Sequence, residues 1–186
     1  MQKSNSKNQN LKIPEEVGEI LTMLAGAGYE AYIVGGSVRH LIMGEVPNDW
    51  DLTTNAKPQE IQKIFPDSFY ENKFGTVGVK TGSDDPTLQI IETTTYRIES
   101  KYTDKRHPDE IKYADKLEDD LKRRDFTINA LAMNAAGDLV DPFGGREDIK
   151  NKIIRAVGDA DERFNEDALR LMRAVRFVAQ LGFDIE

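Results

Sequence analysis

The 186-residue chain contains no cysteine, and this absence removes several classes of site at once. Disulfide frameworks, zinc–thiolate centres and thiol catalysis all require cysteine. Histidine is also scarce, since only His40 and His107 occur, so a histidine-rich metal site is not expected. Any metal ion would therefore be held by oxygen ligands, and Mg²⁺ is the hard cation that suits them best.

Long apolar runs are missing as well. No segment approaches the roughly 18 consecutive apolar residues that a membrane span needs, so we expect no membrane partner. The first ten residues are polar and lack the apolar centre of a secretory signal. We expect residues 1–12 to form a flexible tail. We also expect the protein to be located in the cytoplasm.

Positive charge is in deficit over the chain as a whole. Lysine and arginine total 25 against 33 aspartate and glutamate residues, which gives a net charge of −8 at pH 7. Such a balance argues against coating nucleic acid by bulk attraction, although local basic patches remain possible. With 39% hydrophobic and 31% charged residues, the composition is that of a globular protein. Its length suits one well-buried domain and the start of a second.

The order of apolar and turn residues predicts a mixed α/β fold. Helices are expected over residues 13–28, 37–43, 58–65, 117–124 and 162–181. Strands are expected over residues 31–34, 50–53, 74–80 and 88–96, and residues 127–133 should be helical or pass from helix to strand. Residues 97–115 carry many charges and few apolar anchors, which favours a mobile loop.

Two aspartates, Asp49 and Asp51, stand two positions apart where the strand predicted at 50–53 begins. Side chains at this spacing share one face of a strand, so both carboxylates would point at one spot. Aligned like charges repel each other unless a cation lies between them. A two-metal site uses this arrangement to activate a hydroxyl and to neutralise a leaving pyrophosphate. Alone, a D-x-D pair is more often a solvated pair of acids.

A glycine pair, Gly35 and Gly36, lies between the strand at 31–34 and the next helix. Without a β-carbon the backbone can approach phosphate oxygens closely, and the helix N-terminus supplies N–H donors. Ser37 could add a hydroxyl donor, and Arg39 a charge-assisted pair. G-G-S alone is an ordinary tight turn, but with D-x-D downstream it indicates both halves of a nucleotide–metal site.

Four motifs then occur in one order: G-G-S-V-R with D-W-D, R-R-D-F-T-I-N-A-L-A, D-P-F-G-G-R-E-D and E-D-A-L-R-L-M-R-A-V-R-F. Together they resemble the bacterial tRNA nucleotidyltransferases, the CCA-adding enzymes, which belong with bacterial poly(A) polymerases in the class II branch of the polymerase β-like superfamily. The resemblance covers about residues 34–177. It implies an α/β (α+β) nucleotidyltransferase head over residues 13–150, with a mixed, mostly antiparallel sheet flanked by helices. The start of an all-helical neck domain would follow over residues 151–186.

The reaction implied by this resemblance is template-independent addition of CMP and AMP, from CTP and ATP, to the 3′ end of tRNA. The tRNA 3′ hydroxyl would attack the α-phosphate, two Mg²⁺ ions would bind at Asp49 and Asp51, and pyrophosphate would leave. Family members continue through further helical domains that grip the acceptor stem, so we expect a truncated chain. An A-adding-only relative or a poly(A) polymerase shares every motif. A nucleotide- or RNA-binding module without turnover is the non-enzymatic alternative.

The resemblance also implies roles for individual residues. The triphosphate cradle would comprise Gly35, Gly36, Ser37 and Arg39. Glu92 would be an accessory third catalytic carboxylate beside Asp49 and Asp51, with an ordinary strand-face glutamate as the alternative. The motif that contacts ribose and phosphates would comprise Arg123, Arg124, Asp125 and Asn129.

The predicted helix at 162–181 has two faces. Its apolar face comprises Ala168, Leu171, Met172, Val175, Val178 and Ala179, and the opposite side carries Glu166, Arg170 and Arg173, with Asp167 and Arg176 at the flanks. A surface helix with ion pairs would explain this pattern. The resemblance instead makes Asp167 and Arg170 a protein template, and places Arg173 and Arg176 among the nucleotide-binding residues.

A carboxylate accepts from cytosine N4 or adenine N6, whereas uracil and guanine would face it with a carbonyl. One Asp–Arg pair could therefore select C and A. Two further features concern the family pattern. Residues 97–115 resemble the flexible loop that the family associates with the final A addition. The family usually has an acid after the arginine, where this chain has His40, so an acidic brace for Arg39 is missing.

Overall fold

The computed structural model describes residues 13–71, 75–100 and 110–186. The predicted tail at 1–12, the middle of the predicted loop and His107 lie outside these ranges. The helices are α1 (Glu15–Gly26), α2 (Gly36–Met43), α3 (Pro58–Ile64), α4 (Leu117–Lys122), α5 (Gly145–Asn151), α6 (Ala160–Glu166) and α7 (Leu169–Leu181), with a 3-10 turn, η1 (Thr127–Asn129). No helix among the described residues is long and apolar enough to cross a membrane.

One sheet organises the fold, with the strand order β3-β4-β5-β2-β1-β8-β9. Its strands are β1 (Ala31–Val34), β2 (Asp51–Thr54), β3 (Ser68–Tyr70), β4 (Thr76–Lys80), β5 (Ile90–Thr95), β8 (Ala132–Met133) and β9 (Leu139–Val140). Only β2 and β5 pair in parallel, and the other neighbours in this sheet are antiparallel. The mixed, mostly antiparallel sheet predicted from the sequence is confirmed.

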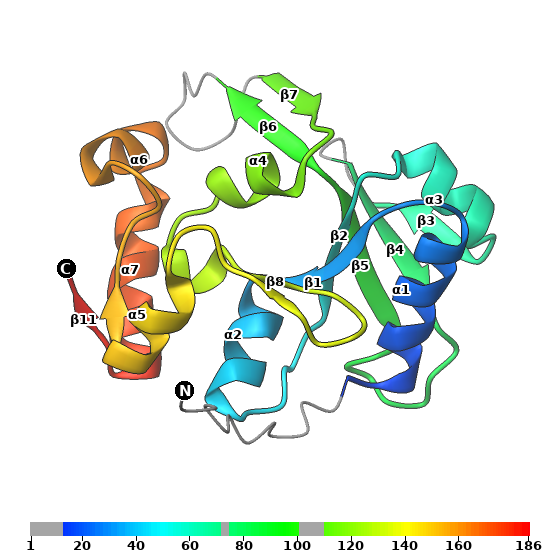
Figure 1. The fold of residues 1–186 in the computed structure, drawn as a ribbon, viewed down its shortest axis with the longest axis horizontal. Coiled ribbons are helices and arrows are strands. Elements are labelled where there is room, and N and C mark those ends of the chain that lie inside the picture. The colour runs from blue at the N-terminus through cyan, green and yellow to red at the C-terminus, as the bar shows by residue number, and fades with distance from the viewer. Residues whose placement is uncertain (1–12, 72–74, 101–109) are drawn as a thin grey trace, which may run out of the picture.

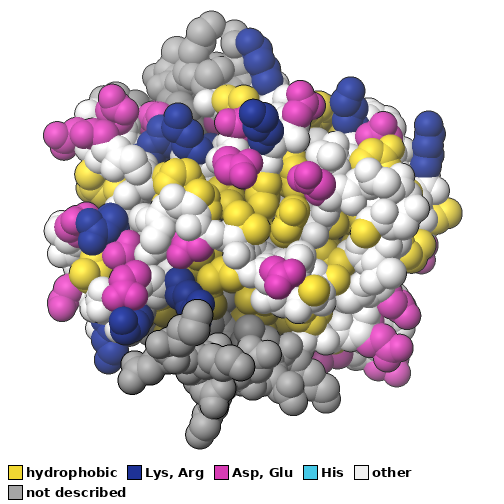
Figure 2. All heavy atoms as spheres, viewed as in Figure 1, with side chains coloured by type: hydrophobic (Ala, Val, Ile, Leu, Met, Phe, Trp, Pro, Cys, Tyr) yellow, Lys and Arg dark blue, Asp and Glu magenta, His cyan; other side chains and the backbone are white. Residues whose placement is uncertain are grey.

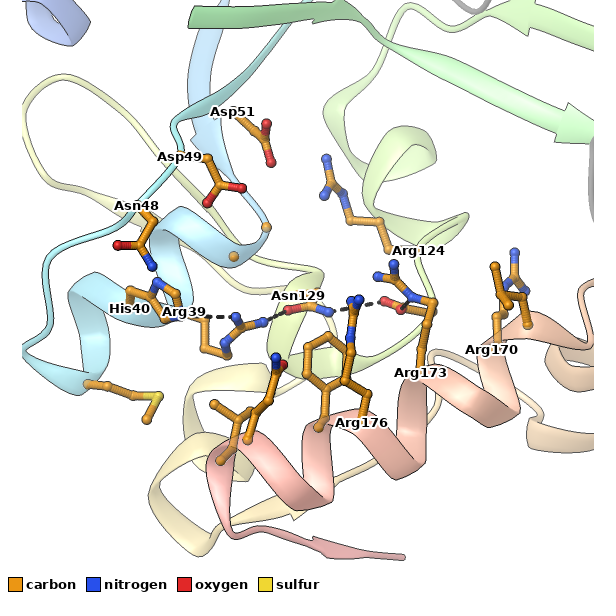
Figure 3. A pocket seen from close by; sticks show the side chains of 18 of the residues that line it. Arg39, His40, Asn48, Asp49, Asp51, Arg124, Asn129, Arg170, Arg173 and Arg176 are labelled. Atoms are coloured by element: carbon orange, nitrogen blue, oxygen red, sulfur yellow. Dashed lines mark hydrogen bonds and ion pairs between the residues drawn. The ribbon is translucent and has the colours of Figure 1, made fainter. Parts of the chain in front are cut away.

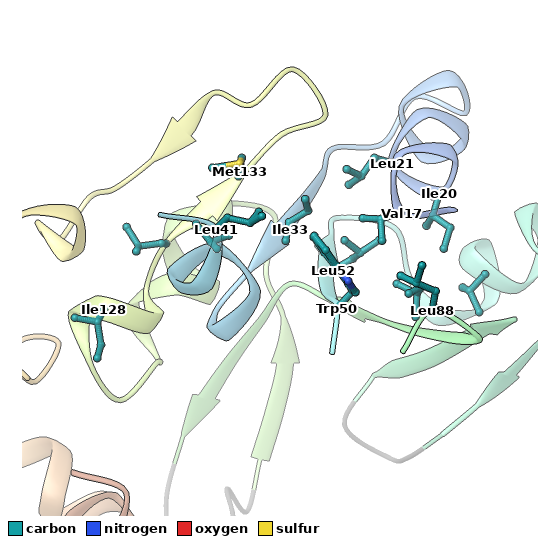
Figure 4. Close-up of a cluster of buried hydrophobic side chains, with 14 of the residues drawn as sticks. Val17, Ile20, Leu21, Ile33, Leu41, Trp50, Leu52, Leu88, Ile128 and Met133 are labelled. Carbon is teal, nitrogen blue, oxygen red and sulfur yellow. The ribbon is translucent and has the colours of Figure 1, made fainter. Parts of the chain in front are cut away.

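Helix α1 packs its apolar face into the core that also holds β1 and β2. Two glutamates lie in its first turn, where negative charge is favoured by the helix dipole. Its apolar residues Val17, Ile20, Leu21 and Leu24 are all buried, and they meet Ile33, Trp50 and Leu52 in one core (Figure 4). Fully burying one such aliphatic side chain contributes about 1.5–3 kcal/mol. The core thus fixes β1 and β2, the two strands that lead into and out of the candidate site.

Five of the helices lie toward two ends of the sheet, and α2 and α4 lie between them (Figure 1). Helices α1 and α3 lie near β3 and β4 at one end, while α5, α6 and α7 form a group at the other. On the face drawn in Figure 2, acidic and basic side chains are mixed along the left side and the top, and a few acidic side chains lie at the lower right. The overall negative charge is therefore not gathered into one acidic area of that visible surface.

The structure departs from the predicted elements near residue 97. The whole stretch 97–115 was expected to be a loop, but its two ends form the antiparallel pair β6 (Arg97–Ser100) and β7 (Glu110–Tyr113). The prediction was wrong for these ends, because cross-strand hydrogen bonds to a distant segment are invisible to local composition. Strand β3 was also missed, because it is an edge strand of only three residues.

The C-terminal helix was expected to be continuous over 162–181, and this is wrong as well. It breaks between α6 and α7 at Asp167, whose backbone is extended with φ −139° and ψ 105°. The Asp167 carboxylate accepts a hydrogen bond from the backbone N–H of Leu169, at 2.8 Å, and so caps the start of α7. Two short strands, β10 (Ile153–Ile154) and β11 (Asp184–Ile185), pair in parallel beside these helices and were not predicted.

Candidate nucleotide site

One cavity of about 1020 Å³ brings together most of the residues predicted from separate motifs (Figure 3). Its lining draws on α2, the entry to β2, the segment from α4 to η1, and α7. The predicted site residues that line it are Gly35, Gly36, Arg39, Asp49, Asp51, Arg123, Arg124, Asp125, Asn129, Asp167, Arg170, Arg173 and Arg176. Ser37 and Glu92 are not among the lining residues.

The glycine pair forms a sharp turn between β1 and α2. Gly35 has φ 67°, a conformation that side chains other than glycine rarely adopt. A β-carbon at Gly35 would lie 2.9 Å from Nη1 of Arg124, and one at Gly36 would lie 3.6 Å from Nη2 of Arg39. Two guanidinium groups therefore flank the turn closely, and this approach requires glycine at position 35.

Both of these arginines retain a hydrogen-bond donor without a partner. The Nε atoms of Arg39 and Arg124 are buried and have no hydrogen-bond partner in the described part of the chain. Leaving a buried donor unsatisfied costs about 1–3 kcal/mol, more for a charged group. Positively charged donors in such a place are suited to an anion with several oxygens, of which a phosphate is the common example.

Arg39 is held by a chain of hydrogen bonds that crosses the cavity (Figure 3). Its Nη1 donates to Oδ1 of Asn129, and Nδ2 of Asn129 donates to Oδ1 of Asp125 at 3.2 Å. Nε of Arg173 donates to the other oxygen of Asp125 at 2.6 Å. The motif around Asp125 thus joins the helix after the glycine turn to the arginine helix α7.

His40 stands where the family usually has an acidic residue, and it contacts Arg39 in place of that acid. Its Nε2 lies 3.2 Å from Nη2 of Arg39, so a neutral imidazole can accept from the guanidinium. Burial lowers the pKa of His40, and the neighbouring Arg39 lowers it further. The neutral form is therefore favoured, and Arg39 is oriented by His40 and Asn129 instead of by a carboxylate.

The two aspartates are placed by Ser37. Its hydroxyl donates to the backbone carbonyl of Asp49 at 3.1 Å and accepts from the backbone N–H of Asp51 at 3.2 Å. The single hydroxyl proton of Ser37 is used in the first of these bonds. Ser37 therefore fixes the loop that carries the aspartates, and its expected role in the triphosphate cradle stays a prediction.

The electrostatics of the aspartate pair fit a cation site. Burial raises the pKa of Asp51; repulsion from Asp49 and Glu71 raises it too, while Arg124 acts in the opposite direction. A bound cation would relieve this repulsion, and carboxylate oxygens are the donors that Mg²⁺ prefers. No group of three or more potential metal ligands was found among the described residues. The donor set seen here is therefore the pair Asp49 and Asp51.

Glu92 lies beside this pair but outside the cavity lining. In the parallel ladder of β2 and β5 its Cα is the partner of Asp51, as expected for an accessory carboxylate on a neighbouring strand. Burial raises its pKa, as do Glu71, Asp51 and Asp49. Glu71, which follows β3, was missed by sequence reasoning because only the pairing of β3, β4 and β5 brings it near.

Helix α7 presents its charged side to the cavity and its apolar side outward. Arg170, Ala174 and Phe177 are its buried residues, whereas Leu171, Met172 and Val175 are at least half exposed. Arg170 donates to Glu166 at 2.7 Å and to the backbone carbonyl of Arg163 at 3.0 Å. Asp167 and Arg170 both line the cavity, as predicted for a base-selecting pair.

Phe177 is a site residue that sequence reasoning did not single out. Its ring lies edge-on to Phe126, with centroids 5.8 Å apart and an interplanar angle of 88°. Three guanidinium carbons lie 5.1–5.7 Å from its centroid, those of Arg39, Arg173 and Arg176. The sequence could have revealed Phe177, because it follows Arg173 by four residues on a predicted helix and so lies on the same face.

Arg123 and Asp120 complete the wall nearest α4. Arg123 pairs with Glu99 at 2.8 Å and with Asp120 at 2.9 Å, so its charge is already balanced by carboxylates. Sequence reasoning missed both acids. Asp120 could have been found from its spacing, three and four residues before the two arginines. Glu99 could not, because the fold of β6 over α4 is what brings it close.

Comparisons with known proteins show the family to which the chain belongs. The family model of the poly A polymerase head domain matches residues 31–155. The CCA-adding enzyme of Leuconostoc mesenteroides is 50% identical over 173 residues, which cover 90% of this chain and 41% of that relative. The CCA-adding enzyme of Lactobacillus helveticus is 52% identical over 168 residues, with coverage of 90% and 41%. This chain therefore spans about two fifths of the length of these relatives.

Solved structures give the same result. A crystal structure of the Bacillus stearothermophilus CCA-adding enzyme in complex with CTP matches with a TM-score of 0.82 and 44% identity, over 92% of this chain and 40% of that one. A tRNA nucleotidyltransferase complexed with a primer tRNA and an incoming ATP analogue matches with a TM-score of 0.70 and 32% identity, over 90% and 46%. The chain belongs to the poly A polymerase head domain family, and its fold is the nucleotidyltransferase head seen in CCA-adding enzymes.

Proposed function

We propose that the protein containing this chain adds CMP and AMP, from CTP and ATP, to the 3′ ends of tRNA without a nucleic-acid template. The observation that carries the proposal is the pair of arginines, Arg39 and Arg124, whose guanidinium groups lie against the Gly35–Gly36 turn and whose buried Nε donors have no partner among the described residues. Both arginines line the cavity that also contains Asp49 and Asp51. An anion site and a cation site therefore adjoin, as a metal-bound triphosphate requires.

Each part of the cavity then has a chemical task. The glycine turn and the two arginines bind the triphosphate, and the hydrogen-bonded position of Arg39 keeps its charge in place as the substrate enters. Two Mg²⁺ ions held by Asp49 and Asp51 would activate the tRNA 3′ hydroxyl and neutralise the departing pyrophosphate. Glu92, the ladder neighbour of Asp51, adds negative charge near these ligands.

The ribose and base are assigned to the other end of the cavity. Asp125 and Asn129 would contact ribose, and Arg173 and Arg176 would add positive charge beside the nucleotide. Arg123, whose charge is balanced by Glu99 and Asp120, lines the same cavity. For the base, Asp167 accepts from the exocyclic amine of C or A, while Arg170 donates to the ring nitrogen or carbonyl. The solved complexes of related enzymes with CTP, and with a primer tRNA and an incoming ATP analogue, support these partners.

Incorporation measured one nucleotide at a time tests this function. The full-length gene product is incubated with Mg²⁺, with tRNA that ends before CCA, and with each nucleoside triphosphate alone and in combination. We expect C addition from CTP, followed by A addition from ATP, and no addition of U or G. Long A tails, or A addition without C, would instead indicate a poly(A) polymerase or an A-adding enzyme.

Two variants separate the metal site from base selection. Asp49→Ala should abolish transfer while leaving the thermal unfolding of the protein close to wild type, because Asp49 is exposed. The double variant Asp167→Ala, Arg170→Ala should relax base choice more than it weakens triphosphate binding. Transfer by the first variant at the wild-type rate would remove the metal assignment, and unaltered rejection of UTP by the second would remove the protein template.

A further inference from the structure

A single buried carboxylate, Asp120 on α4, lies beneath the arginines of the candidate site. Its side chain is fully inaccessible to solvent. Taking such a charge out of water is costly unless it is paired and hydrogen-bonded, so its position needs several donors.

Those donors come from three different parts of the fold. Asp120 accepts from Nε of Arg123 at 2.9 Å and from Nη2 of Arg124 at 3.4 Å. It also accepts from the backbone N–H of Arg97, the first residue of β6, at 3.3 Å. Oγ1 of Thr53 lies 3.4 Å from the same carboxylate and shares its single proton with the nearer backbone carbonyl of Thr94, at 3.1 Å. Thr53 lies on β2, two residues after the candidate metal ligand Asp51. One carboxylate thus ties together α4, β6 and the strand of the aspartate pair.

The two arginines depend on Asp120 to different degrees. Arg123 has a second carboxylate partner in Glu99. For Arg124, Asp120 is the one hydrogen-bond partner among the described residues, and it holds Nη2 only. With Nη2 held there, Nη1 lies against Gly35 and Nε stays buried without a partner in the cavity wall.

The geometry points to Asp120 as a positioning residue that orients Arg124 toward the triphosphate at the glycine turn. This assignment rests on the proposed function and adds a residue that never touches the nucleotide. Asp120 stays ionised in that role: burial acts to raise its pKa, yet the guanidinium groups of Arg123 and Arg124 hold the pKa below its usual value. An ionised carboxylate can therefore anchor Arg124 over the working pH range.

The positioning role of Asp120 is tested by Asp120→Asn, which removes the negative charge of the side chain and nearly keeps its shape. Asp120→Asn, Arg124→Ala and the double variant are prepared in the full-length protein, with Glu118→Gln as the control. Glu118 lies two residues earlier on α4 and is exposed. Each protein is measured for thermal unfolding, for KM and kcat with CTP, and for inhibition by inorganic tripolyphosphate, which reports on the triphosphate site without a base or ribose.

We expect Asp120→Asn to raise the KM for CTP and to weaken tripolyphosphate inhibition by about tenfold, the order of one charge-assisted hydrogen bond. In the Arg124→Ala background the same change should add less than twofold, because the residue it positions is gone. Glu118→Gln should change nothing. If Asp120→Asn does not fold, Asp120→Glu keeps the charge, moves the carboxylate by one methylene, and should shift KM in the same direction.

The outcomes separate two failures. If Arg124→Ala leaves KM and tripolyphosphate inhibition unchanged, the triphosphate role of Arg124 is wrong, and the proposed function loses the observation that carries it. If Arg124→Ala weakens both but the Asp120 variants lower only the melting temperature, Asp120 is a structural residue and the positioning role alone is overturned. Equal tenfold effects of Asp120→Asn in both backgrounds would likewise overturn it.

Discussion

Replacement of Phe177 by leucine should weaken the junction between α7 and the rest of the cavity. The Phe177 side chain is 4% exposed, so its contacts are made inside the protein. Leucine keeps most of the apolar volume, and a swap of this kind by itself costs less than about 1.5 kcal/mol. The larger loss comes from the aromatic ring, which leucine does not have.

The magnitude follows from the ring's neighbours. The edge-to-face pair with Phe126 is worth about 0.5–1.5 kcal/mol. Each of the three guanidinium groups, at 5.1–5.7 Å, contributes about 0.5–1 kcal/mol at an exposed site and more where it is buried, as Arg39 is. Because such contributions are not fully additive, we expect a loss of about 2–3 kcal/mol in the free energy of unfolding.

Urea denaturation and thermal unfolding measure this loss. For a chain of this size, 2–3 kcal/mol corresponds to a fall in melting temperature of roughly 4–12 °C. Met172→Leu on the same helix, where Met172 is 65% exposed, is the control and should stay within about 0.5 kcal/mol of wild type. If the Phe177→Leu protein is as stable as that control, the contacts of the ring with Phe126 and the three arginines do not stabilise the fold.

Three further predictions concern other sites. Asp51→Asn should raise the melting temperature of the metal-free protein at pH 7 while abolishing transfer. The folded pKa of Asp51 is raised, so its ionisation costs stability as pH rises, and the gain should vanish in acid. Gly145→Ala should lower the free energy of unfolding by about 3 kcal/mol or more, since its β-carbon would lie 2.1 Å from a backbone carbonyl oxygen of η1. Gly18→Ala, with open space around the new methyl group, should stabilise α1 in the same unfolding assay. Between pH 7 and pH 5 the free energy of unfolding should fall less for His40→Gln than for wild type. The pKa of His40 is lower in the folded state than in the unfolded state, so acid protonates the unfolded state first and destabilises the wild-type fold.

Much of the fold could be predicted from local patterns. The helix at 13–28 was recognisable because Val17, Ile20, Leu21 and Leu24 repeat at helical spacing, and the structure buries all four. The strand at 31–34 and the turn at Gly35 followed from an apolar run that ends in glycine. These predictions succeeded because the information lies within a few neighbouring residues.

The failures come from hydrogen bonds that residue composition and periodicity do not reveal. The ends of the predicted loop at 97–115 became β6 and β7 because they hydrogen-bond to each other. The predicted helix at 162–181 broke because the side chain of Asp167 caps the next helix. Ser37 stays a predicted residue of the triphosphate cradle, and the sequence did not show that its hydroxyl also bonds the loop of Asp49 and Asp51.

By itself, the sequence determined the chemistry available: oxygen ligands for a hard cation, glycines for close approach, and arginines for phosphate. Residue types and their spacing are enough for that, since each property belongs to a side chain or a short segment. Only the tertiary structure decided which of these groups meet. It placed the guanidinium groups of Arg39 and Arg124 against one glycine turn, and it buried Asp120 in contact with the second arginine. These contacts join segments up to about ninety residues apart, and only packing of the sheet against its helices brings such segments together.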